Sequence, residues 1–310
     1  MKKVLAIIGP TGCGKTELSV KIAKRTGAEI ISSDSMQIYK GMDIGTAKVT
    51  KEEMENVPHH MIDILSPSES FSVSDFCKEA KKKAEEIFKK GKPVVLVGGT
   101  GLYTDSFIKD IDFSEEGEKD LKLRAKLEDY AKQFGAEALF EKLREIDEKS
   151  AQTIHPNNVK RVIRAIEYYT LTGEPISLHN ERTKSKPSPY DYVYIGLTRD
   201  REELYERIDK RVDLMMEKGL LGEVMTLYKM GLSKDHTSMQ ALGYKELFWY
   251  INGKATLEES VRILKRDSRR YAKRQLTWFG KNPDINWINL SSQPNGEERA
   301  MEILKSKNFI

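Results

Sequence analysis

The glycine-rich segment at residues 9–16 has the residue types and spacing that point most directly to chemistry. It reads GPTGCGKT and matches G-x-x-x-x-G-K-[ST], between an apolar run at residues 4–8 and a helical pattern. Successive backbone N–H groups would form a concave anion site with the helix N-terminus, Lys15 would add a positive charge, and the Thr16 hydroxyl can bind Mg²⁺. A glycine-rich turn without a ligand is the alternative. We predict a diphosphate or triphosphate site made by Gly9, Pro10, Thr11, Gly12, Cys13, Gly14, Lys15 and Thr16.

A carboxylate follows the second predicted strand, residues 29–32. The carboxyl ends of parallel strands share one edge of a sheet, so Asp34 is expected beside the phosphate site. A carboxylate in that place can accept or orient the proton of an incoming nucleophile. The alternative is that Asp34 caps a turn with its neighbouring serines. Gln37, just beyond it, carries an amide able to bond the edge of a base, although most surface glutamines do not.

The strand predicted at residues 94–97 ends without an acid. NTPases with this phosphate loop usually carry a carboxylate there for magnesium and water, whereas this sequence continues Gly98-Gly99-Thr100. A hydrolytic motor is therefore disfavoured, and a group-transfer enzyme that does not activate water fits better. The glycines allow close approach of a ligand, and the Thr100 hydroxyl could reach a phosphate oxygen. An ordinary glycine-rich turn would explain the same residues.

Basic residues are concentrated in one late segment although the net charge is only +4. Residues 262–274 contain a single acid, Asp267, and aromatic residues lie in or beside the segment. On a helix this composition favours binding to a phosphate backbone, with a steep salt dependence, although a solvated charged face is the common alternative. The basic residues are Arg262, Lys265, Arg266, Arg269, Arg270, Lys273 and Arg274.

The elements that must position these residues alternate between strand and helix. This order predicts an α/β fold, a P-loop NTPase-like doubly wound parallel sheet. Residues 113–190 are predicted to be an inserted all-helical subdomain, with residues 1–112 and 191–310 forming the core. After a strand at residues 192–197 the pattern predicts helices almost throughout. Two cysteines exclude a disulfide framework, and we expect a cytoplasmic protein because no apolar stretch could span a bilayer.

The motifs together resemble the tRNA dimethylallyltransferase (tRNA isopentenyltransferase) family. Segments that match the family run through almost the whole chain in family order and are far more specific than the phosphate loop. Some eukaryotic relatives add a C-terminal zinc finger, which is absent here, so the resemblance implies a bacterial-type enzyme. The matching segments are residues 9–16, ISSDSMQIYKGMDIGTAK at 31–48, VPHHMID at 57–63, VGGTGLY at 97–103, NNVKRVIRAIE at 157–167, QALGYKE at 240–246 and YAKRQLTWF at 271–279.

The resemblance implies transfer of a dimethylallyl group from its diphosphate to the N6 amine of the adenosine 3′-adjacent to the anticodon. The phosphate loop, with Lys15 and with Mg²⁺ on Thr16, would hold the diphosphate, and Asp34 would act on the amine. Thr100 and Arg211 would help hold the leaving group. The inserted subdomain would clamp the anticodon stem-loop of a tRNA bound by a monomeric enzyme. The expected RNA contacts are Asp34, Ser35, Met36, Gln37, Thr100, Arg124, Arg161, Arg164, Gln240, Arg269 and Arg270.

Three other functions are compatible with parts of the sequence. A small-molecule P-loop kinase explains the phosphate loop but leaves the basic segment without a role. An adenine-nucleotide isopentenyltransferase would use the same chemistry on a free nucleotide. An RNA-binding protein gated by a nucleotide would not need Asp34.

Overall fold

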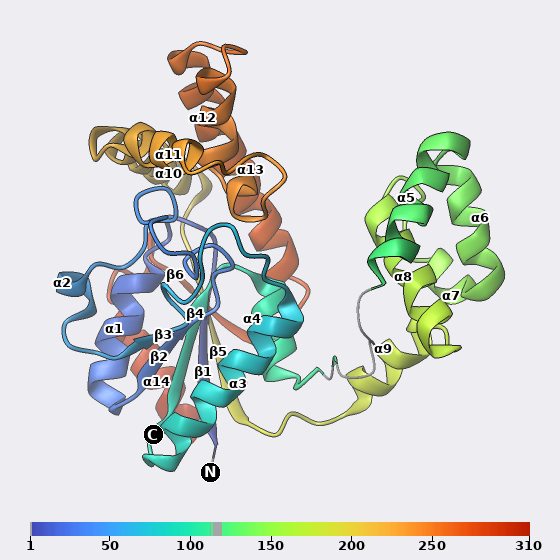
Figure 1. Cartoon of the computed structure of the whole chain (residues 1–310). Helices are drawn as coiled ribbons and strands as arrows, with labels where there is room; N and C mark the ends of the chain where they lie inside the picture. The colour runs from blue at the N-terminus through green and yellow to red at the C-terminus, as the bar shows by residue number, and fades with distance from the viewer. Residues whose placement is uncertain (1, 112, 114–119) are drawn as a thin grey trace. The chain divides into compact units, whose positions relative to one another are not determined.

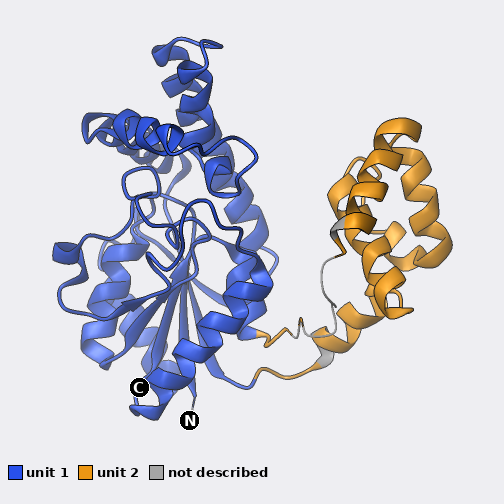
Figure 2. Cartoon of the chain, viewed as in Figure 1, with its two compact units in different colours: residues 1–108, 189–310 blue, residues 109–188 orange. Residues whose placement is uncertain are grey.

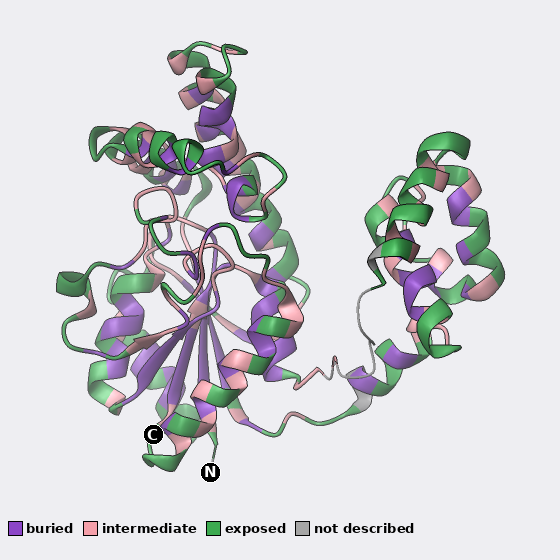
Figure 3. Ribbon diagram, in the orientation of Figure 1, coloured by how far each residue is buried: buried purple, intermediate pink, exposed green. Residues whose placement is uncertain are grey.

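The sheet at the centre of the computed structural model has six strands, all parallel, in the order β3-β2-β4-β1-β5-β6. The structure describes residues 2–111, 113 and 120–310. Almost every residue of the central strands is buried, which fits a sheet covered on both faces (Figure 3). The strands are β1 (Lys3–Ile8), β2 (Glu29–Ser32), β3 (His59–His60), β4 (Val94–Gly98), β5 (Asp191–Thr198) and β6 (Ile285–Asn289).

Helices cover both faces of the sheet, as the α/β prediction requires (Figure 1). On one face, α1 packs against β1, β2 and β4, and α14 packs against α1 and β6. On the other face, α3 and α4 lie against β1, β2 and β4. The helices of this part are α1 (Lys15–Thr26), α2 (Lys51–Met54), α3 (Val73–Lys89), α4 (Gly101–Ile108), α10 (Arg201–Glu217), α11 (Leu220–Lys229), α12 (Tyr244–Ile251), α13 (Leu257–Phe279), α14 (Gly296–Ser306) and the 3₁₀ turn η2 (Ser238–Gln240).

The helices α10 to α13 form a second layer beyond the carboxyl edge of the sheet (Figure 1). A separate apolar cluster joins these helices to the long loop that follows β2. Glu223 of α11 holds that loop, because its carboxylate accepts hydrogen bonds from the backbone N–H groups of Asp43, Ile44 and Gly45 at 2.8, 2.8 and 3.1 Å. The Tyr244 hydroxyl donates to the same carboxylate at 2.6 Å. The helical layer therefore holds the loop after β2 in place through the Glu223 carboxylate.

The chain divides into two compact units, residues 1–108 with 189–310 and residues 109–188 (Figure 2). These bounds lie within a few residues of those expected from the sequence, and residue 112, the expected boundary, is outside the described residues. The second unit is built from helices around an apolar core that includes Leu139, Leu143, Val162 and Ile163. Its helices are α5 (Leu121–Phe134), α6 (Ala136–Ile146), α7 (Glu148–Ala151), α8 (Val159–Thr172) and α9 (Ile176–Ser185).

The late part of the chain contains one strand that the sequence pattern did not predict. The sequence after residue 197 was expected to be nearly all helical, but Ile285–Asn289 forms β6 at the edge of the sheet. This strand contains three polar or exposed positions and pairs only with β5, so its local pattern is weak. The predicted P-loop-type α/β fold is nonetheless confirmed. Among the residues that the structure describes, no helix is long and apolar enough to cross a membrane.

A buried carboxylate fixes the amino end of β2. Glu29 is 1% exposed and contacts His60 at 2.9 Å, Lys90 at 3.0 Å and Lys92 at 3.0 Å. Burial alone would raise the pKa of Glu29, but hydrogen bonds from these three partners outweigh it and lower the pKa from 4.5 to about 2. The ionised form therefore stabilises the fold above the ordinary pKa, and this contribution is lost as the pH falls toward 2.

Replacing Glu29 with glutamine should lower the free energy of unfolding by roughly 2 kcal/mol near neutral pH, because Lys90, Lys92 and His60 lose their shared carboxylate partner. The difference from the native chain should shrink as the pH falls from about 5 to about 3, where the native carboxylate loses its advantage. Urea unfolding followed by circular dichroism measures both effects. Glu85→Gln removes an exposed pair with Lys2 and serves as control. A Glu29→Gln deficit that does not change with pH would contradict this account.

Candidate active site

The register of three adjacent strands brings the predicted site residues to one edge. Ile8 of β1 lies opposite Gly98 of β4, and Val97 of β4 lies opposite Ser32 of β2. The phosphate loop, the Gly98–Thr100 turn and the turn at Asp34 therefore begin side by side. The predictions about which loops meet at the carboxyl edge agree with this geometry.

The phosphate loop has the conformation that an anion site needs. Gly9, Gly12 and Gly14 all have positive φ, and a Cβ at position 9 would lie 2.3 Å from the carbonyl oxygen of Leu197. Helix α1 begins at Lys15, whose Nζ donates to the carbonyl of Pro10 at 2.8 Å. Burial lowers the pKa of this ammonium, and the charge of Arg211 adds to the effect. An anion in the loop would compensate both.

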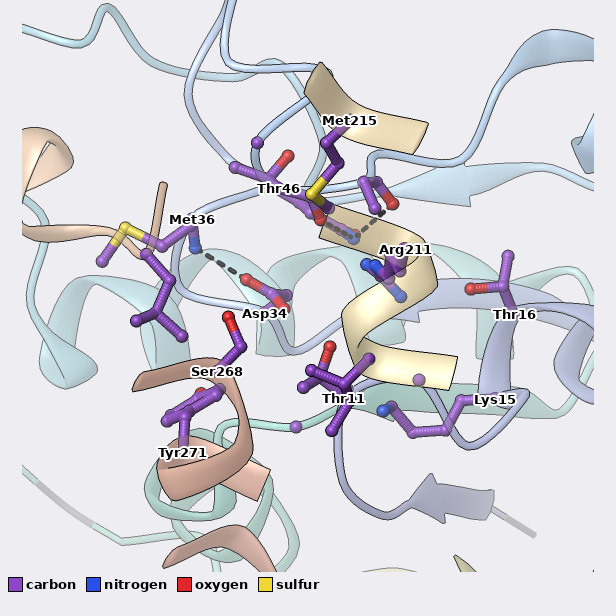
Figure 4. A pocket seen from close by; sticks show the side chains of 18 of the residues that line it. Thr11, Lys15, Thr16, Asp34, Met36, Thr46, Arg211, Met215, Ser268 and Tyr271 are labelled. Carbon is purple, nitrogen blue, oxygen red and sulfur yellow. Dashed lines mark hydrogen bonds between the residues drawn. The ribbon is translucent and has the colours of Figure 1, made fainter. Parts of the chain in front are cut away.

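Asp34 lies in the same cavity and bonds its own turn through one oxygen. Its Oδ1 accepts from the backbone N–H of Met36 at 2.9 Å (Figure 4). Within the described residues, no hydrogen bond to Oδ2 accompanies it, so the second oxygen is available to a ligand. Asp34 therefore caps its own turn with Oδ1, which is the structural alternative given above. Its second oxygen can still act on a ligand.

Thr100 links the β4 turn to the Asp34 turn. Its hydroxyl accepts from the backbone N–H of Ser35 at 3.2 Å and lies 3.4 Å from the Ser35 hydroxyl. Burial raises the pKa of nearby Tyr271 to about 12, and the charge of Asp34 contributes, while hydrogen bonding with Thr100 opposes the rise. The phenol therefore stays protonated at neutral pH.

Arg211 projects from α10 into the space between the phosphate loop and Asp34 (Figure 4). Burial lowers the pKa of its guanidinium, and the charges of Asp34, Cys13 and Glu53 oppose that effect. No ion pair of Arg211 is found among the described residues, although its planar N–H groups suit a phosphate. The guanidinium is therefore placed to receive an anionic ligand.

Lys15, Asp34, Arg211 and Tyr271 line one cavity of 880 Å³ (Figure 4), whereas Thr100 is not among its lining residues. One side carries the phosphate loop with Lys15 and Thr16, and the other carries the turn after β2. Apolar side chains complete the wall, among them Met36, Met215 and Leu242. The cavity can therefore hold a charged diphosphate, an apolar group and a further ring at the same time.

Comparison with known proteins identifies the family. A family model described as IPP transferase matches residues 37–282. A tRNA dimethylallyltransferase of Acetivibrio thermocellus is 53% identical over 305 residues, which cover 98% of this chain and 97% of that protein. One from Halalkalibacterium halodurans is 49% identical and covers 100% of this chain and 96% of that protein. The chain belongs to the IPP transferase family.

Solved structures agree with this assignment to the IPP transferases. A full-length tRNA isopentenylpyrophosphate transferase from Bacillus halodurans superposes with a TM-score of 0.75 at 47% identity, covering 99% of this chain and 97% of that one. A eukaryotic dimethylallyltransferase described as acting on tRNA has a TM-score of 0.86 at 31% identity, covering 100% of this chain and 79% of that one. The family resemblance predicted from the motifs is confirmed.

Two residues predicted to contact RNA lie in the cavity of this IPP transferase but are held by the protein. The Gln37 amide donates to the carbonyls of Thr46 and Ala47, both at 3.4 Å, and its oxygen accepts from Ser32 at 3.1 Å. Gln240 is exposed at the rim, where its amide donates to the carbonyl of Lys234. Both side chains therefore stabilise the loops whose backbone carbonyls they bond.

The predicted RNA contacts of the helical unit differ in exposure. Arg161 is exposed on α8, and Arg164 is half-buried on the same helix. Arg124 of α5 forms a double hydrogen bond with the buried Glu167 of α8, at 2.8 and 2.5 Å. Arg124 therefore joins two helices of this unit whatever else it contacts.

In the fold, acidic residues of another helix balance part of the positive charge of the basic segment on α13. Arg269 bonds both carboxylate oxygens of Asp209 on α10, at 2.5 and 2.6 Å. Lys265 pairs with Asp213 of the same helix at 2.6 Å. Arg270 stays 63% exposed, with only a 3.6 Å approach to Asp267. The interpretation of residues 262–274 as seven cations against one acid overlooked acids that lie far away in the sequence.

Sequence reasoning missed several residues that shape the phosphate loop. Arg207 and Arg199 donate to the carbonyls of Gly12 and Cys13, at 3.1 and 3.3 Å. Gln275 of α13 accepts from the backbone N–H of Thr11 at 2.9 Å. Arg207 precedes Arg211 by four residues on α10, but no local pattern indicates that Gln275 is buried between the loops that follow β1 and β4.

Replacing Arg211 with glutamine should weaken binding of inorganic diphosphate by about tenfold to a hundredfold, since a charged hydrogen-bond donor is lost from a buried anion site. Isothermal titration calorimetry with Mg²⁺ present measures this change. Lys218→Gln removes an exposed charge just after the same helix and should leave the affinity unchanged. Equal affinities of the Arg211 variant and the native chain would mean that Arg211 does not face the diphosphate.

Proposed function

We propose that this chain transfers the dimethylallyl group of dimethylallyl diphosphate to the N6 amine of the tRNA adenosine 3′-adjacent to the anticodon, releasing diphosphate. The observation that carries the proposal is that the phosphate loop, Arg211 and Asp34 line one 880 Å³ cavity. The family membership and the names of full-length relatives support the same reaction. We further propose that the enzyme takes tRNA as its substrate in the cytoplasm and that it acts as a monomer.

Departure of the diphosphate makes the allylic carbon electrophilic enough for a neutral amine. Negative charge then grows on the leaving oxygens, where preorganised cations and N–H donors stabilise it most. The backbone of the phosphate loop with Lys15 would bind one end of the diphosphate, and Arg211 and Thr100 would bind the side that faces Asp34. The apolar wall at Met36 and Met215 suits the five-carbon chain.

Magnesium fits this site as a partner of the substrate. Within the described residues, no three His, Cys, Asp or Glu side chains gather into a metal site. Mg²⁺ commonly takes one or two protein ligands and completes its shell with phosphate oxygens and water. The Thr16 hydroxyl at the start of α1 would be the protein ligand, and the ion would neutralise charge on the leaving diphosphate.

Asp34 is the residue that acts on the nucleophile in this proposal. Its Oδ1 is held by the N–H of Met36, so the carboxylate has a fixed orientation, and Oδ2 can accept an N6 proton. An adenine stacked in an anticodon loop cannot reach the cavity, so the base must leave the stack. The turn formed by Ser35, Met36 and Gln37 would meet this extruded base.

The RNA would bind along exposed cations. Arg270, Lys273 and Arg274 are exposed on α13, and Arg274 also lines the cavity. Arg161 and Arg164 of the helical unit would contact the anticodon stem-loop, together with Gln240 at the cavity rim. Arg269 and Arg124 would act chiefly through their ion pairs, which orient the helices that carry the contacts.

Incubation with Mg²⁺, dimethylallyl diphosphate and unmodified tRNA, followed by nucleoside mass analysis, separates the candidate functions. Gain of a C5H8 unit on one adenosine supports the proposal. Transfer to free AMP alone would favour an adenine-nucleotide isopentenyltransferase, and phosphate transfer from ATP would favour a kinase. Tight tRNA binding without any product would leave only an RNA-binding role.

Asp34→Ala should abolish dimethylallyl transfer and change tRNA affinity by less than about threefold, because the carboxylate acts on the amine and contributes little to the phosphate contacts that dominate RNA binding. Product formation and filter binding measure the two effects. Asp63→Ala removes another half-exposed carboxylate of the same region, which pairs with Lys48, and serves as control. Loss of tRNA binding in the Asp34 variant would assign it a structural role.

Neutralising Arg270 and Lys273 together should weaken tRNA binding and reduce the slope of log K against log salt by about one to two, since each lost phosphate contact removes roughly one unit. Binding is measured over a series of KCl concentrations. Lys305→Gln with Lys307→Gln removes two exposed charges at the end of α14 and should leave the slope unchanged. Identical slopes for the two double variants would mean that α13 does not face RNA.

A further inference from the structure

We infer that Gln275 is a positioning residue for the reaction, holding the phosphate loop and the turn after β4 at the spacing that diphosphate binding requires. This inference rests on the proposed function. Gln275 lies on α13, some 260 residues after the loop that it contacts, and neither the family name nor the phosphate-loop motif assigns it a role.

The Gln275 amide joins the phosphate loop to the turn after β4, beyond Ile8 and Gly98, where β1 and β4 are last paired. Its Oε1 accepts from the backbone N–H of Thr11 at 2.9 Å, and its Nε2 donates to the carbonyl of Gly99 at 2.9 Å. The side chain is 5% exposed, so neither bond competes freely with water. One rigid planar group thus adds a second link between the two loops, beyond the paired ends of β1 and β4.

This contact leaves no room for a side chain at position 99. A Cβ built there would lie 2.1 Å from Nε2 of Gln275, closer than any real contact between such atoms. The φ of Gly99 is not positive, so its backbone conformation does not itself demand glycine. Gly99 is needed because the amide approaches the turn directly.

Neighbouring turns of α13 contact the same loops. Tyr271, four residues before Gln275, interacts with Thr100, which in turn bonds the Ser35 N–H next to Asp34. Trp278, three residues after Gln275, donates from its indole N–H to Asp105 of α4 at 2.8 Å and packs against Gly101. One face of α13 therefore connects the diphosphate side of the cavity to the side that holds Asp34.

The chemistry of the contact requires an amide. Thr11 presents a donor and Gly99 presents an acceptor, so the side chain between them must both accept and donate. An ionised glutamate only accepts, so it would face the Gly99 carbonyl without a proton and bring negative charge beside the diphosphate loop. A protonated glutamate has the shape of glutamine and supplies one acceptor and one donor.

The experiment compares Gln275→Glu with Gln275→Met in the full chain, with inorganic diphosphate and Mg²⁺ as the probe. Calorimetry at about pH 7.5 should give Gln275→Glu an affinity about tenfold or more below that of the native chain, the loss expected for an unsatisfied buried carbonyl and a repelling charge. At about pH 5.5, where burial favours a protonated carboxyl, the ratio of the two affinities should fall toward one. Gln275→Met should be weakened at both pH values without recovery.

Thr277→Glu is the matched control, because it adds a carboxylate at an exposed position of the same helix and should not change the affinity at either pH. Thermal unfolding of each variant reports its stability separately. If Gln275→Glu unfolds, Gly99→Ala is the second perturbation: it displaces Nε2 while Gln275 remains, and it should weaken diphosphate binding by a similar factor.

The outcomes separate this inference from the proposed function. A native chain that does not bind diphosphate would defeat the proposed function itself. A native chain that binds diphosphate while Gln275→Glu matches it at both pH values would overturn the positioning role alone. A weakened Gln275→Glu variant whose deficit is the same at both pH values would also overturn it, because a packing role predicts no recovery on protonation.

Discussion

The adjacency of three parallel strands is the constraint on which the site depends. Because β2, β4 and β1 are neighbours in register, their three carboxyl ends deliver a phosphate loop, a glycine turn and a carboxylate to one place. Parallel strands require long crossovers, so the helices that return the chain also cover both faces of the sheet. The backbone hydrogen bonds of the sheet therefore bring the site residues close together, without any contribution from their side chains.

Closing that edge with helices α10 and α13 creates a second constraint, which concerns charge. Lys15 and Arg211 are both partly buried in one cavity, and the loss of water around them lowers the pKa of each. Two cations held close together with little water are costly unless an anion lies between them. The cavity is therefore organised for a charge that the protein lacks, and Asp34 supplies only part of it. A leaving diphosphate, whose negative charge increases during reaction, is the kind of ligand that gains most from such a site.

Local sequence signals predicted the parts of this arrangement that depend on local structure. Residues 29–32 form a strand at the predicted bounds, and Asp34 lines the cavity just beyond the end of that strand, beside the phosphate loop. Features that arise from pairing across the chain were missed. The two-residue strand His59–His60 exists only because it lies beside β2, and β6 only because it lies beside β5. The role of Gln275 depends on loops from two distant strands, so no window of sequence contains it.

The same limit explains why the charge on α13 was misjudged. A charge count along the sequence treats every cation between residues 262 and 274 as available, yet Asp209 and Asp213 of α10 pair with Arg269 and Lys265 across the helix interface. These pairs fix α10, which carries Arg211, against α13, which carries Tyr271 and Gln275. Cations of the basic segment therefore also align the two helices that line the cavity. Residues further along the same helix, such as Arg270 and Lys273, remain exposed, so one helix can face nucleic acid on one side and support the reaction on the other.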